Sequence, residues 1–384
     1  MADIAEHFLT SLYVHDAFAV KDLEIPIARG QDRRRHLLLT GPNGSGKSSI
    51  LRALAEELAE HPLGPGQKRR HEVVPSAAVE ARGLPDDLDV SKMLLAFMPA
   101  SRALDLERPS GPSRIDERQF LHSQGAASML LQFLVNLRTE QALAREDGDA
   151  AAADRIGQRF ADFEVQLRQI LDDDGARLLF DRSEWDFGIE LSGGRRVEFE
   201  TLPDGISGIL YMWASLMIPA EAIRRAVVSD PPGWALVDEP ELHLHARLQE
   251  MVLPFLTTMF PNVQLIVATH SPAVLASLPD ATIFDLRSRK AIDSADLHGI
   301  RYGTILTEHF GIETDFDLAT TRKLKRLKVL MDADPAPGTE EFDEMRAMAR
   351  ELSDVPHLLV AQCAAYRAPR LPRQVSLDAL RSRC

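Results

Sequence analysis

A glycine-rich segment near the N-terminus has the residue types that bind phosphate groups. It reads Gly41, Pro42, Asn43, Gly44, Ser45, Gly46, Lys47 and Ser48, is followed by Ser49, and fits the pattern G-x-x-x-x-G-K-[ST]. The glycines allow main-chain N–H groups to converge on phosphates, and the start of a following helix favours negative charge. We expect Lys47 to reach the β- and γ-phosphates of ATP and Ser48 to ligate Mg²⁺.

Two adjacent carboxylates, Asp238 and Glu239, end the apolar run Trp234 to Val237. Phosphoryl transfer needs a metal ligand and a group that orients the attacking water. We expect Asp238 to enter the ligand shell of Mg²⁺ and Glu239 to act as the general base. The alternative is a polar end of a buried strand without a chemical role. The phosphate-binding segment in the same chain favours the catalytic interpretation.

His270 follows a second apolar run, residues 264–268, within the segment Thr269-His270-Ser271-Pro272. A helix between the two runs makes them neighbouring parallel strands, whose carboxyl ends meet at one edge of a sheet. An imidazole at this edge can hydrogen-bond a γ-phosphate oxygen. We therefore expect His270 to sense the γ-phosphate, although an isolated histidine is more often structural.

The elements that position these residues follow from the apolar spacing. Apolar stretches at residues 12–14 and 23–27 predict an antiparallel hairpin, and residues 36–40 predict the strand before the glycine-rich segment. The helical spacing of apolar residues from 50 to 58 predicts a helix directly after that segment. The order strand, loop, helix is the context that the phosphate-binding pattern requires.

The middle of the chain changes character twice. Residues 62–88 predict loops and short strands, and 93–97 predict a further strand. Residues 116–172 predict two amphipathic helices with a turn at 146–149. These helices form either a lid packed on the rest of the chain or an arm that binds a partner.

Composition limits the class of protein. The 384 residues are 45% hydrophobic and 27% charged, which is typical of folded globular chains. The net charge of −14 disfavours general attraction to nucleic acids or anionic membranes. Cys363 and Cys384 are too few for a disulfide framework and suit a cytoplasmic protein. The most apolar window, Ile209 to Ile218, is too short to span a bilayer and predicts a buried helix.

In this order, GPNGSGKS (41–48), LVDEPELHLH (236–245) and VATHSP (267–272) resemble the motifs of ABC-type ATPase heads. Such heads occur in SMC and recombination-repair proteins, OLD nucleases and bacterial anti-phage ATPases. The chain resembles in particular the small stand-alone ATPases of defence systems, such as the Septu, PARIS and retron-associated types.

The resemblance implies an α/β fold, that of a P-loop NTPase with an ABC-type head that has a parallel core sheet and an antiparallel β subdomain. It assigns residues 1–60 and 180–300 to the head and residues 61–179 to an insertion that carries the helical hairpin. Residues 301–384 are expected to form a C-terminal helical region with a basic tail.

In such proteins two heads enclose ATP, and each phosphate-binding loop faces a signature helix of the other copy, usually L-S-x-G. Residues 191–194 match the letters but lie between two predicted strands, so we expect a hairpin turn there. Residues 202–205 match less well but precede the long apolar helix, which makes Asp204 and Gly205 the candidate nucleotide contacts. Pro203 stands where the family has a serine, which implies weak turnover unless Ser207 supplies the hydroxyl.

One further family feature is altered here, and a pair of histidines needs an interpretation. The strand at 93–97 leads to Arg102 without the family's glutamine, since the next one is Gln119. The resemblance implies a phosphate or intersubunit contact for Arg102, and a surface ion pair is the alternative. His243 and His245 fall in the segment that crosses between the two heads, which favours communication across a dimer over metal binding.

Basic residues gather near the C-terminus. The segment with Arg322, Lys323, Lys325, Arg326 and Lys328 forms either a solvated helix face or a nucleic-acid contact. The tail adds Arg367, Arg370, Arg373, Arg381 and Arg383. Asp332 and Asp334 continue the helical pattern, and too few residues follow them for the nuclease domain of OLD enzymes.

Three functions are consistent with these residues. The first is an ATPase that forms a homodimer around ATP and acts as a switch or sensor in an anti-phage complex with a separate effector, a nuclease or toxin. The second is an ATP-gated scaffold with little turnover that holds such an effector. The third is a DNA-repair ATPase that uses the basic segment. A membrane partner is not expected.

Overall fold

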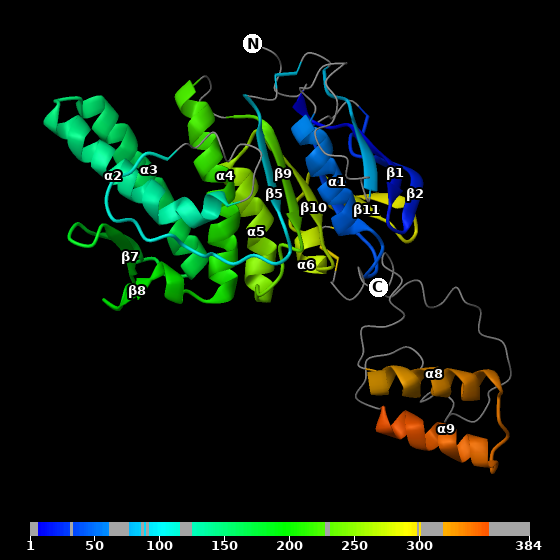
Figure 1. Ribbon diagram of the computed structural model, residues 1–384. Coiled ribbons are helices and arrows are strands. Elements are labelled where there is room, and N and C mark those ends of the chain that lie inside the picture. The colour runs from blue at the N-terminus through cyan, green and yellow to red at the C-terminus, as the bar shows by residue number, and fades with distance from the viewer. Residues whose placement is uncertain are drawn as a thin grey trace, which may run out of the picture. The chain divides into compact units, whose positions relative to one another are not determined.

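The computed structural model describes residues 7–30, 34–60, 77–85, 88–89, 92–115, 125–226, 231–297, 299–300 and 318–352. The chain divides into two compact units, residues 1–302 and 303–384 (Figure 1). All three motif segments lie in the first unit, and the basic segment lies in the second.

The strands are short and the helices vary widely in length. The strands are β1 (Ser11–Ala17), β2 (Val20–Pro26), β3 (His36–Thr40), β4 (Ala77–Arg82), β5 (Leu94–Met98), β6 (Arg177–Asp181), β7 (Asp186–Glu190), β8 (Arg196–Glu198), β9 (Gly233–Asp238), β10 (Val263–Ala268), β11 (Ala281–Asp285) and β12 (Lys290–Asp293). The helices are α1 (Lys47–Glu60), α2 (Leu130–Glu146), α3 (Ala150–Leu171), α4 (Asp204–Ala226), α5 (Ala246–Met259), α6 (Pro272–Leu275), α8 (Leu318–Asp332) and α9 (Glu340–Glu351). Short 3₁₀ turns are η4 (Ala126–Met129), η5 (Phe199–Thr201) and η6 (Ser294–Leu297).

A six-stranded sheet forms the centre of the first unit, in the order β12-β11-β3-β10-β9-β5. Strands β11, β3, β10, β9 and β5 are parallel, and β12 pairs with β11 in the antiparallel direction. Both faces of β3, β9 and β10 are buried, as in parallel sheets covered on two sides. Ala268 of β10 lies opposite Asp238 of β9, which confirms that these two strand ends share one edge.

Helix α1 packs between the central sheet and an antiparallel sheet of order β2-β1-β4 (Figure 1). Its apolar residues Ile50, Leu51, Leu54 and Leu58 are fully buried in the core that both sheets share. Burial of this face explains why the helix forms directly after the glycine-rich loop. The predicted hairpin, strand and helix are confirmed.

Strand β5 shows that the expected limits of the insertion are too wide. It pairs with β9, and Leu94 lies opposite Gly233. A Cβ on Gly233 would come within 2.0 Å of the Leu94 carbonyl oxygen, so this close approach requires glycine. The central sheet therefore includes a strand from the range 61–179, and residues 61–76 and 116–124 of that range lie outside the described residues.

The helical hairpin α2–α3 packs on α4, beside the central sheet (Figure 1). Phe163 of α3 stacks on Trp213 of α4 with ring centroids 4.3 Å apart and planes 7° apart. Arg159 of α3 forms an ion pair of 2.5 Å with the buried Glu221 of α4. These contacts support the interpretation of a lid packed on the head over that of a projecting arm.

Helix α4 is longer than expected, because it continues through Pro219. Its residues from Ile209 to Ile218 are mostly buried, which confirms a buried helix. Residues 191–194, which match the letters of the signature motif, form the turn of the β7–β8 hairpin, as predicted. Gly194 adopts φ +74° in this turn. Among the described residues, no helix is long and apolar enough to cross a bilayer.

The second unit contains a helical pair, α8 and α9, around the buried residues Leu324, Leu327, Leu330, Met345 and Leu352. Arg326 forms two hydrogen bonds with Glu344, and Lys323 pairs with Glu351. Part of the predicted basic face is therefore neutralised within the unit. The arginine-rich tail lies outside the described residues.

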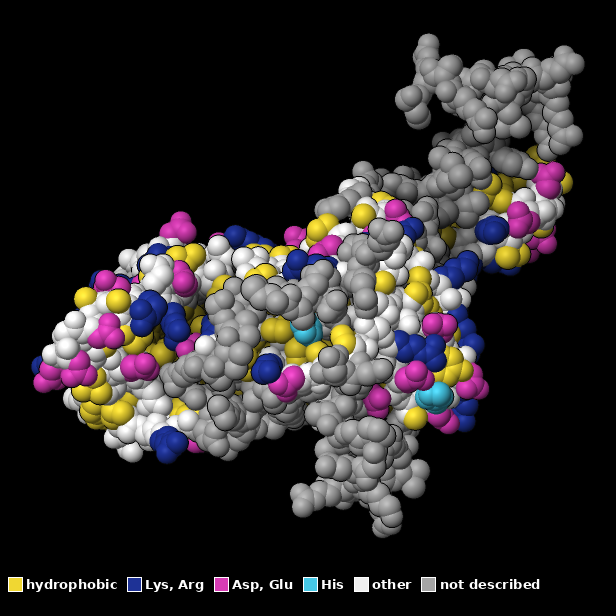
Figure 2. Space-filling view, turned by 90° about the horizontal axis from the view of Figure 1, so that it is seen from above, with side chains coloured by type: hydrophobic (Ala, Val, Ile, Leu, Met, Phe, Trp, Pro, Cys, Tyr) yellow, Lys and Arg dark blue, Asp and Glu magenta, His cyan; other side chains and the backbone are white. Residues whose placement is uncertain are grey.

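Charge is spread over the surface in view. Figure 2 shows acidic and basic side chains interspersed over the described part of this face. Neither sign of charge is therefore gathered in one region of the described part of this face.

Candidate nucleotide-binding site

The glycine-rich loop connects β3 to α1 and packs against the turn between β1 and β2. Gly44 and Gly46 have φ values of +76° and +96°, which favour glycine over other residues. A Cβ on Gly46 would lie 2.8 Å from the Ala17 carbonyl oxygen. The fold therefore needs these glycines to bring the loop against the antiparallel sheet, besides any role with phosphates.

Lys47 is the first residue of α1, and it is buried. Its side chain reaches back to the start of the glycine-rich loop. Its Nζ donates to the carbonyl oxygens of Gly41 (2.9 Å) and Pro42 (3.2 Å). Burial lowers the pKa of the Lys47 ammonium, and the carboxylates of Glu239 and Asp238 oppose this shift. The ammonium thus lies against the loop and within electrostatic reach of the carboxylates after β9.

Asp238 is 3% exposed, and its Oδ1 has no hydrogen-bond partner among the residues that the structure describes. A buried carboxylate oxygen without a donor is costly unless a cation neutralises it. Carboxylate and hydroxyl oxygens are ligands that Mg²⁺ accepts, so Asp238 together with Ser48 on α1 fits this metal.

Glu239 follows with a left-handed backbone, φ +47°, which is unusual for a residue other than glycine. Its N–H donates to the Ala268 carbonyl oxygen at 2.8 Å, which ties the turn after β9 to the end of β10. This backbone turns the chain away from the strand direction directly after Asp238.

Arg102 donates hydrogen bonds to the main chain of the same turn. Its Nη1 donates to the Asp238 carbonyl oxygen at 2.8 Å and its Nη2 to the Glu239 carbonyl oxygen at 2.7 Å. Burial lowers the pKa of the guanidinium, and Glu241 and other nearby charges oppose this. The alternative of a surface ion pair is wrong, because the half-buried guanidinium donates to main-chain oxygens of the turn after β9.

His270 lies in the turn after β10, with its side chain exposed. Burial of part of the ring lowers the pKa of His270, Lys47 lowers it further, and Glu239 and Glu241 raise it. The imidazole is therefore close enough to Lys47 and to the carboxylates after β9 to feel their charges. The fold brings four predicted residues, Lys47, Asp238, Glu239 and His270, to one edge of the central sheet.

Glu241 is a residue that the sequence did not single out. One of its carboxylate oxygens, Oε1, accepts hydrogen bonds from the Thr269 hydroxyl (2.8 Å), the His270 N–H (2.7 Å) and the Ser271 N–H (3.2 Å). The only local signal is a third acid close behind the first two, which gives no indication of its partners.

The candidate signature segment lies at the N-terminus of α4. Pro203 and Asp204 are exposed, whereas Gly205 is buried, and a Cβ on it would lie 2.6 Å from the His243 carbonyl oxygen. The Ser207 hydroxyl donates to the Leu202 carbonyl oxygen at 3.3 Å. Gly205 thus allows α4 to approach the loop after β9, and a nucleotide contact of this segment stays a prediction that involves a second copy.

His243 and His245 are exposed in the loop between β9 and α5. His243 has φ +63°, and His245 is the residue before the first turn of α5. Both side chains are accessible to a second copy, as the interpretation of an intersubunit loop requires.

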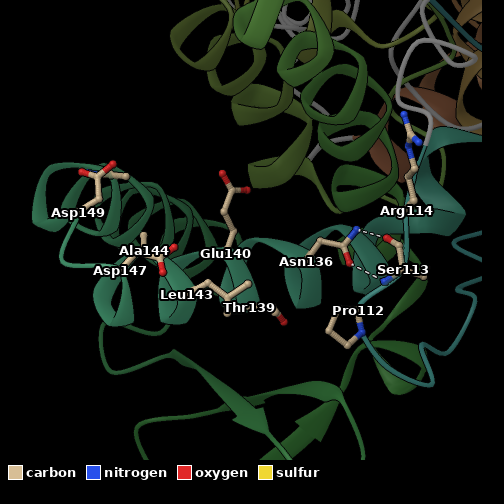
Figure 3. A pocket seen from close by; sticks show the side chains of 11 residues that line it. Pro112, Ser113, Arg114, Asn136, Thr139, Glu140, Leu143, Ala144, Asp147 and Asp149 are labelled. Atoms are coloured by element: carbon tan, nitrogen blue, oxygen red, sulfur yellow. Dashed lines mark hydrogen bonds between the residues drawn. The ribbon is translucent and has the colours of Figure 1, made fainter.

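A cavity of about 470 Å³ lies away from these residues, between the segment 112–114 and α2 (Figure 3). Asn136 holds this segment by accepting from the Ser113 N–H (3.1 Å) and donating to the Ser113 carbonyl oxygen (2.7 Å). The cavity is lined by loop and helix-surface residues and includes none of the predicted site residues.

The chain is similar to one protein family, to several defence proteins and, in fold, to solved structures. Residues 103–276 match the family described as "AAA domain, putative AbiEii toxin, Type IV TA system", a range that includes Asp238 and His270 but not the glycine-rich loop. A Septu protein PtuA of Bacillus mycoides is 23% identical over 381 residues, which cover 91% of this chain and 51% of that protein. The chain thus spans about half the length of this relative.

Shorter matches have higher identity. The "Retron Ec83 probable ATPase" of Escherichia coli is 41% identical over 81 residues, 19% of this chain and 15% of that protein. The "Retron Vc95 probable ATPase" of Vibrio cholerae is 34% identical over 76 residues, 18% of this chain and 15% of that protein. An SMC head bound to the C-terminal winged-helix domain of ScpA covers 72% of this chain and 94% of its own length, with 12% identity and a TM-score of 0.40. The three motifs, their place in the fold and the sequence matches confirm the resemblance to ABC-type P-loop ATPases of the Septu and retron kind.

Proposed function

We propose that the chain binds ATP and Mg²⁺, hydrolyses ATP, and acts as a nucleotide-driven dimer switch or sensor in an anti-phage defence complex with a separate effector. The observation that carries the proposal is one edge of the central sheet, where the segments after β3, β9 and β10 bring Lys47, Asp238, Glu239 and His270 within electrostatic reach of one another. Ligands of open parallel sheets bind at the carboxyl ends of the strands, which is where these four residues lie.

The side chains divide the chemistry among them. Asp238 and Ser48 would hold Mg²⁺, which when bound neutralises charge on the phosphates. Glu239 accepts a proton from the attacking water, and Lys47 stabilises negative charge on the phosphates. His270 donates a hydrogen bond to the γ-phosphate and loses this contact when phosphate leaves.

The dimer and the effector extend this proposal to the assembly. Exposed Asp204 at the start of α4 and exposed His243 and His245 would face the nucleotide site of a second copy. A helix N-terminus carries partial positive charge and suits a γ-phosphate. The similarity to Septu protein PtuA and to retron ATPases supports a role in defence with a nuclease or toxin as effector.

Two variants test the enzyme. Glu239→Gln should bind ATP with Mg²⁺ and form the dimer but lose at least about 100-fold in turnover, because the base is gone. Lys47→Ala should lose ATP binding. Calorimetry with ATP and Mg²⁺, phosphate release and light scattering measure the three quantities, with Glu184→Gln on the exposed β6–β7 turn as control. Undiminished turnover in Glu239→Gln, or unchanged ATP uptake in Lys47→Ala, contradicts the proposal.

A scaffold with little turnover is a second candidate, and Pro203 is the observation that favours it. No hydroxyl is available at this position, and the Ser207 hydroxyl is bonded to the Leu202 carbonyl oxygen. In this case the nucleotide gates the dimer and hydrolysis is slow. Rapid multiple turnover by the purified dimer without a partner argues against the scaffold.

Repair of DNA receives less support, since Lys323 and Arg326 of the basic segment pair with acids of α9. Duplex binding that weakens with salt, and that is lost when Arg322, Lys323, Lys325 and Arg326 are changed to glutamine, would restore this function.

A further inference from the structure

The turn after β10 that carries His270 is fastened by a carboxylate of the neighbouring loop. Glu241 Oε1 accepts from the Thr269 hydroxyl, the His270 N–H and the Ser271 N–H at 2.8, 2.7 and 3.2 Å. The Ser271 N–H is shared with Thr269 Oγ1 at 3.0 Å. One side-chain oxygen therefore bonds to three successive residues of this turn.

A second side-chain bridge ties the same two segments together. The Ser271 hydroxyl donates to Gln249 Oε1 at 2.7 Å, and Gln249 Nε2 donates to the Leu244 carbonyl oxygen at 2.8 Å. The His270 turn is thus bound both to Glu241 and, through Gln249, to the segment of the loop that carries His243. Glu241 Oε2 is buried without a hydrogen-bond partner in the part of the chain that the structure describes, so Oε1 carries the whole of this link.

We infer that Glu241 is a positioning residue for His270: it holds the main chain at residues 269–271 so that the imidazole points at the γ-phosphate, and it couples the intersubunit loop to this histidine. The inference rests on the proposed ATPase function. Glu241 acts here through hydrogen bonds to the main chain and not as a base on water, which is the role of Glu239. A displacement of about 1 Å at a contact of this kind is enough to lower a catalytic rate about 100-fold.

A double-mutant cycle separates this role from a general structural one. Glu241→Ala should lower kcat at least about 10-fold while the Kd for ATP with Mg²⁺ stays within about threefold of the wild type. In a His270→Ala background the same change should lower kcat less than about twofold, because the residue that Glu241 positions is already absent. Equal losses in the two backgrounds, or a loss of ATP affinity as large as the loss of kcat, overturn the inference.

Glu241→Gln supplies the conservative comparison. The amide keeps an oxygen that can accept the same three hydrogen bonds, so its kcat should stay within about threefold of the wild type. A glutamine variant as inactive as the alanine variant would show that the negative charge itself is required, and would overturn a positioning role.

A second route is available where Glu241→Ala does not fold. Thr269→Val removes one donor to Glu241 without removing the carboxylate, and should lower kcat about threefold to 10-fold in the wild type but not in the His270→Ala background. ATP binding and turnover of the wild type separate a failure of this inference from a failure of the proposed function. A wild-type chain that neither binds nor hydrolyses ATP contradicts the ATPase, whereas normal wild-type turnover with additive mutations contradicts the role of Glu241 alone.

Discussion

Arg102→Ala is expected to destabilise the fold, because the guanidinium donates to two successive carbonyl oxygens of the turn after β9. Nη1 and Nη2 donate to the carbonyl oxygens of Asp238 and Glu239 at 2.8 and 2.7 Å, across a sequence separation of 136 and 137 residues. The second of these carbonyls belongs to a residue with φ +47°. Removal of the side chain leaves the carbonyl oxygens of Asp238 and Glu239 without these donors. It also frees Glu239 to leave a left-handed backbone conformation that residues other than glycine rarely adopt.

The magnitude follows from these contacts. Hydrogen bonds from a charged donor contribute about 1.5–3 kcal/mol each, so two of them set an upper range of about 3–6 kcal/mol. Water that enters the vacated space can donate to the two oxygens and so reduces the loss. We therefore expect the free energy of unfolding to fall by about 2–4 kcal/mol. The left-handed Glu239 costs about 1–2 kcal/mol by itself, so the freed turn should relax and move the carboxylate. Turnover should fall at least about 10-fold.

Urea unfolding and phosphate release measure the two effects in Arg102→Ala, Arg102→Lys and, as control, Arg114→Ala, which removes an exposed arginine. Arg102→Lys should recover less than half of the lost stability, since a compact ammonium cannot reproduce a planar fork that reaches two carbonyls. A change below about 0.5 kcal/mol in Arg102→Ala, or full recovery by lysine, would refute the reasoning.

Two further changes probe other parts of the fold. Gly205→Ala places a Cβ 2.6 Å from the His243 carbonyl oxygen and should destabilise the chain by about 1–3 kcal/mol. Gly208→Ala, one turn later in α4 with nothing within 4 Å, should leave urea unfolding unchanged or raise stability by up to about 1 kcal/mol, and equal effects at both glycines would disprove the close contact. His36 Nδ1 accepts from the Leu265 N–H at 2.9 Å, and burial lowers the pKa of His36 below 6.5. Because the unfolded state then binds more protons, stability should be full above about pH 6.5 and fall as pH drops, with a smaller slope in His36→Gln than in the wild type or in His15→Gln.

Local patterns predict which residues meet at this edge of the central sheet, because each part of the candidate site is a contiguous segment. The glycine-rich loop, the acids after β9 and His270 after β10 each follow an apolar run, and parallel pairing of those runs brings the ends together. The turn at 191–194 is predicted for the same reason, since alternating residues flank its glycines on both sides.

The partners of Arg102 and Glu241 have no such signal. Arg102 binds main-chain oxygens more than a hundred residues away, and every residue type has a main-chain oxygen. Glu241 likewise receives two of its three hydrogen bonds from main-chain N–H groups. The edge position of β5 is equally hidden, because its apolar residues resemble those of the other buried strands and strand order depends on packing in three dimensions.

Packing contacts and hydrogen bonds connect the helical hairpin α2–α3, through α4, to the loop after β9. Phe163 of α3 stacks on Trp213 near the middle of α4, and at the N-terminus of α4 Gly205 lies against the His243 carbonyl oxygen. The loop that contains His243 also contains Glu241, which holds His270. Close-packed interfaces of this kind shift as units, since they lack the free volume to deform gradually. The hairpin is therefore packed on the same helix whose N-terminal turn lies against the loop of His243 and Glu241.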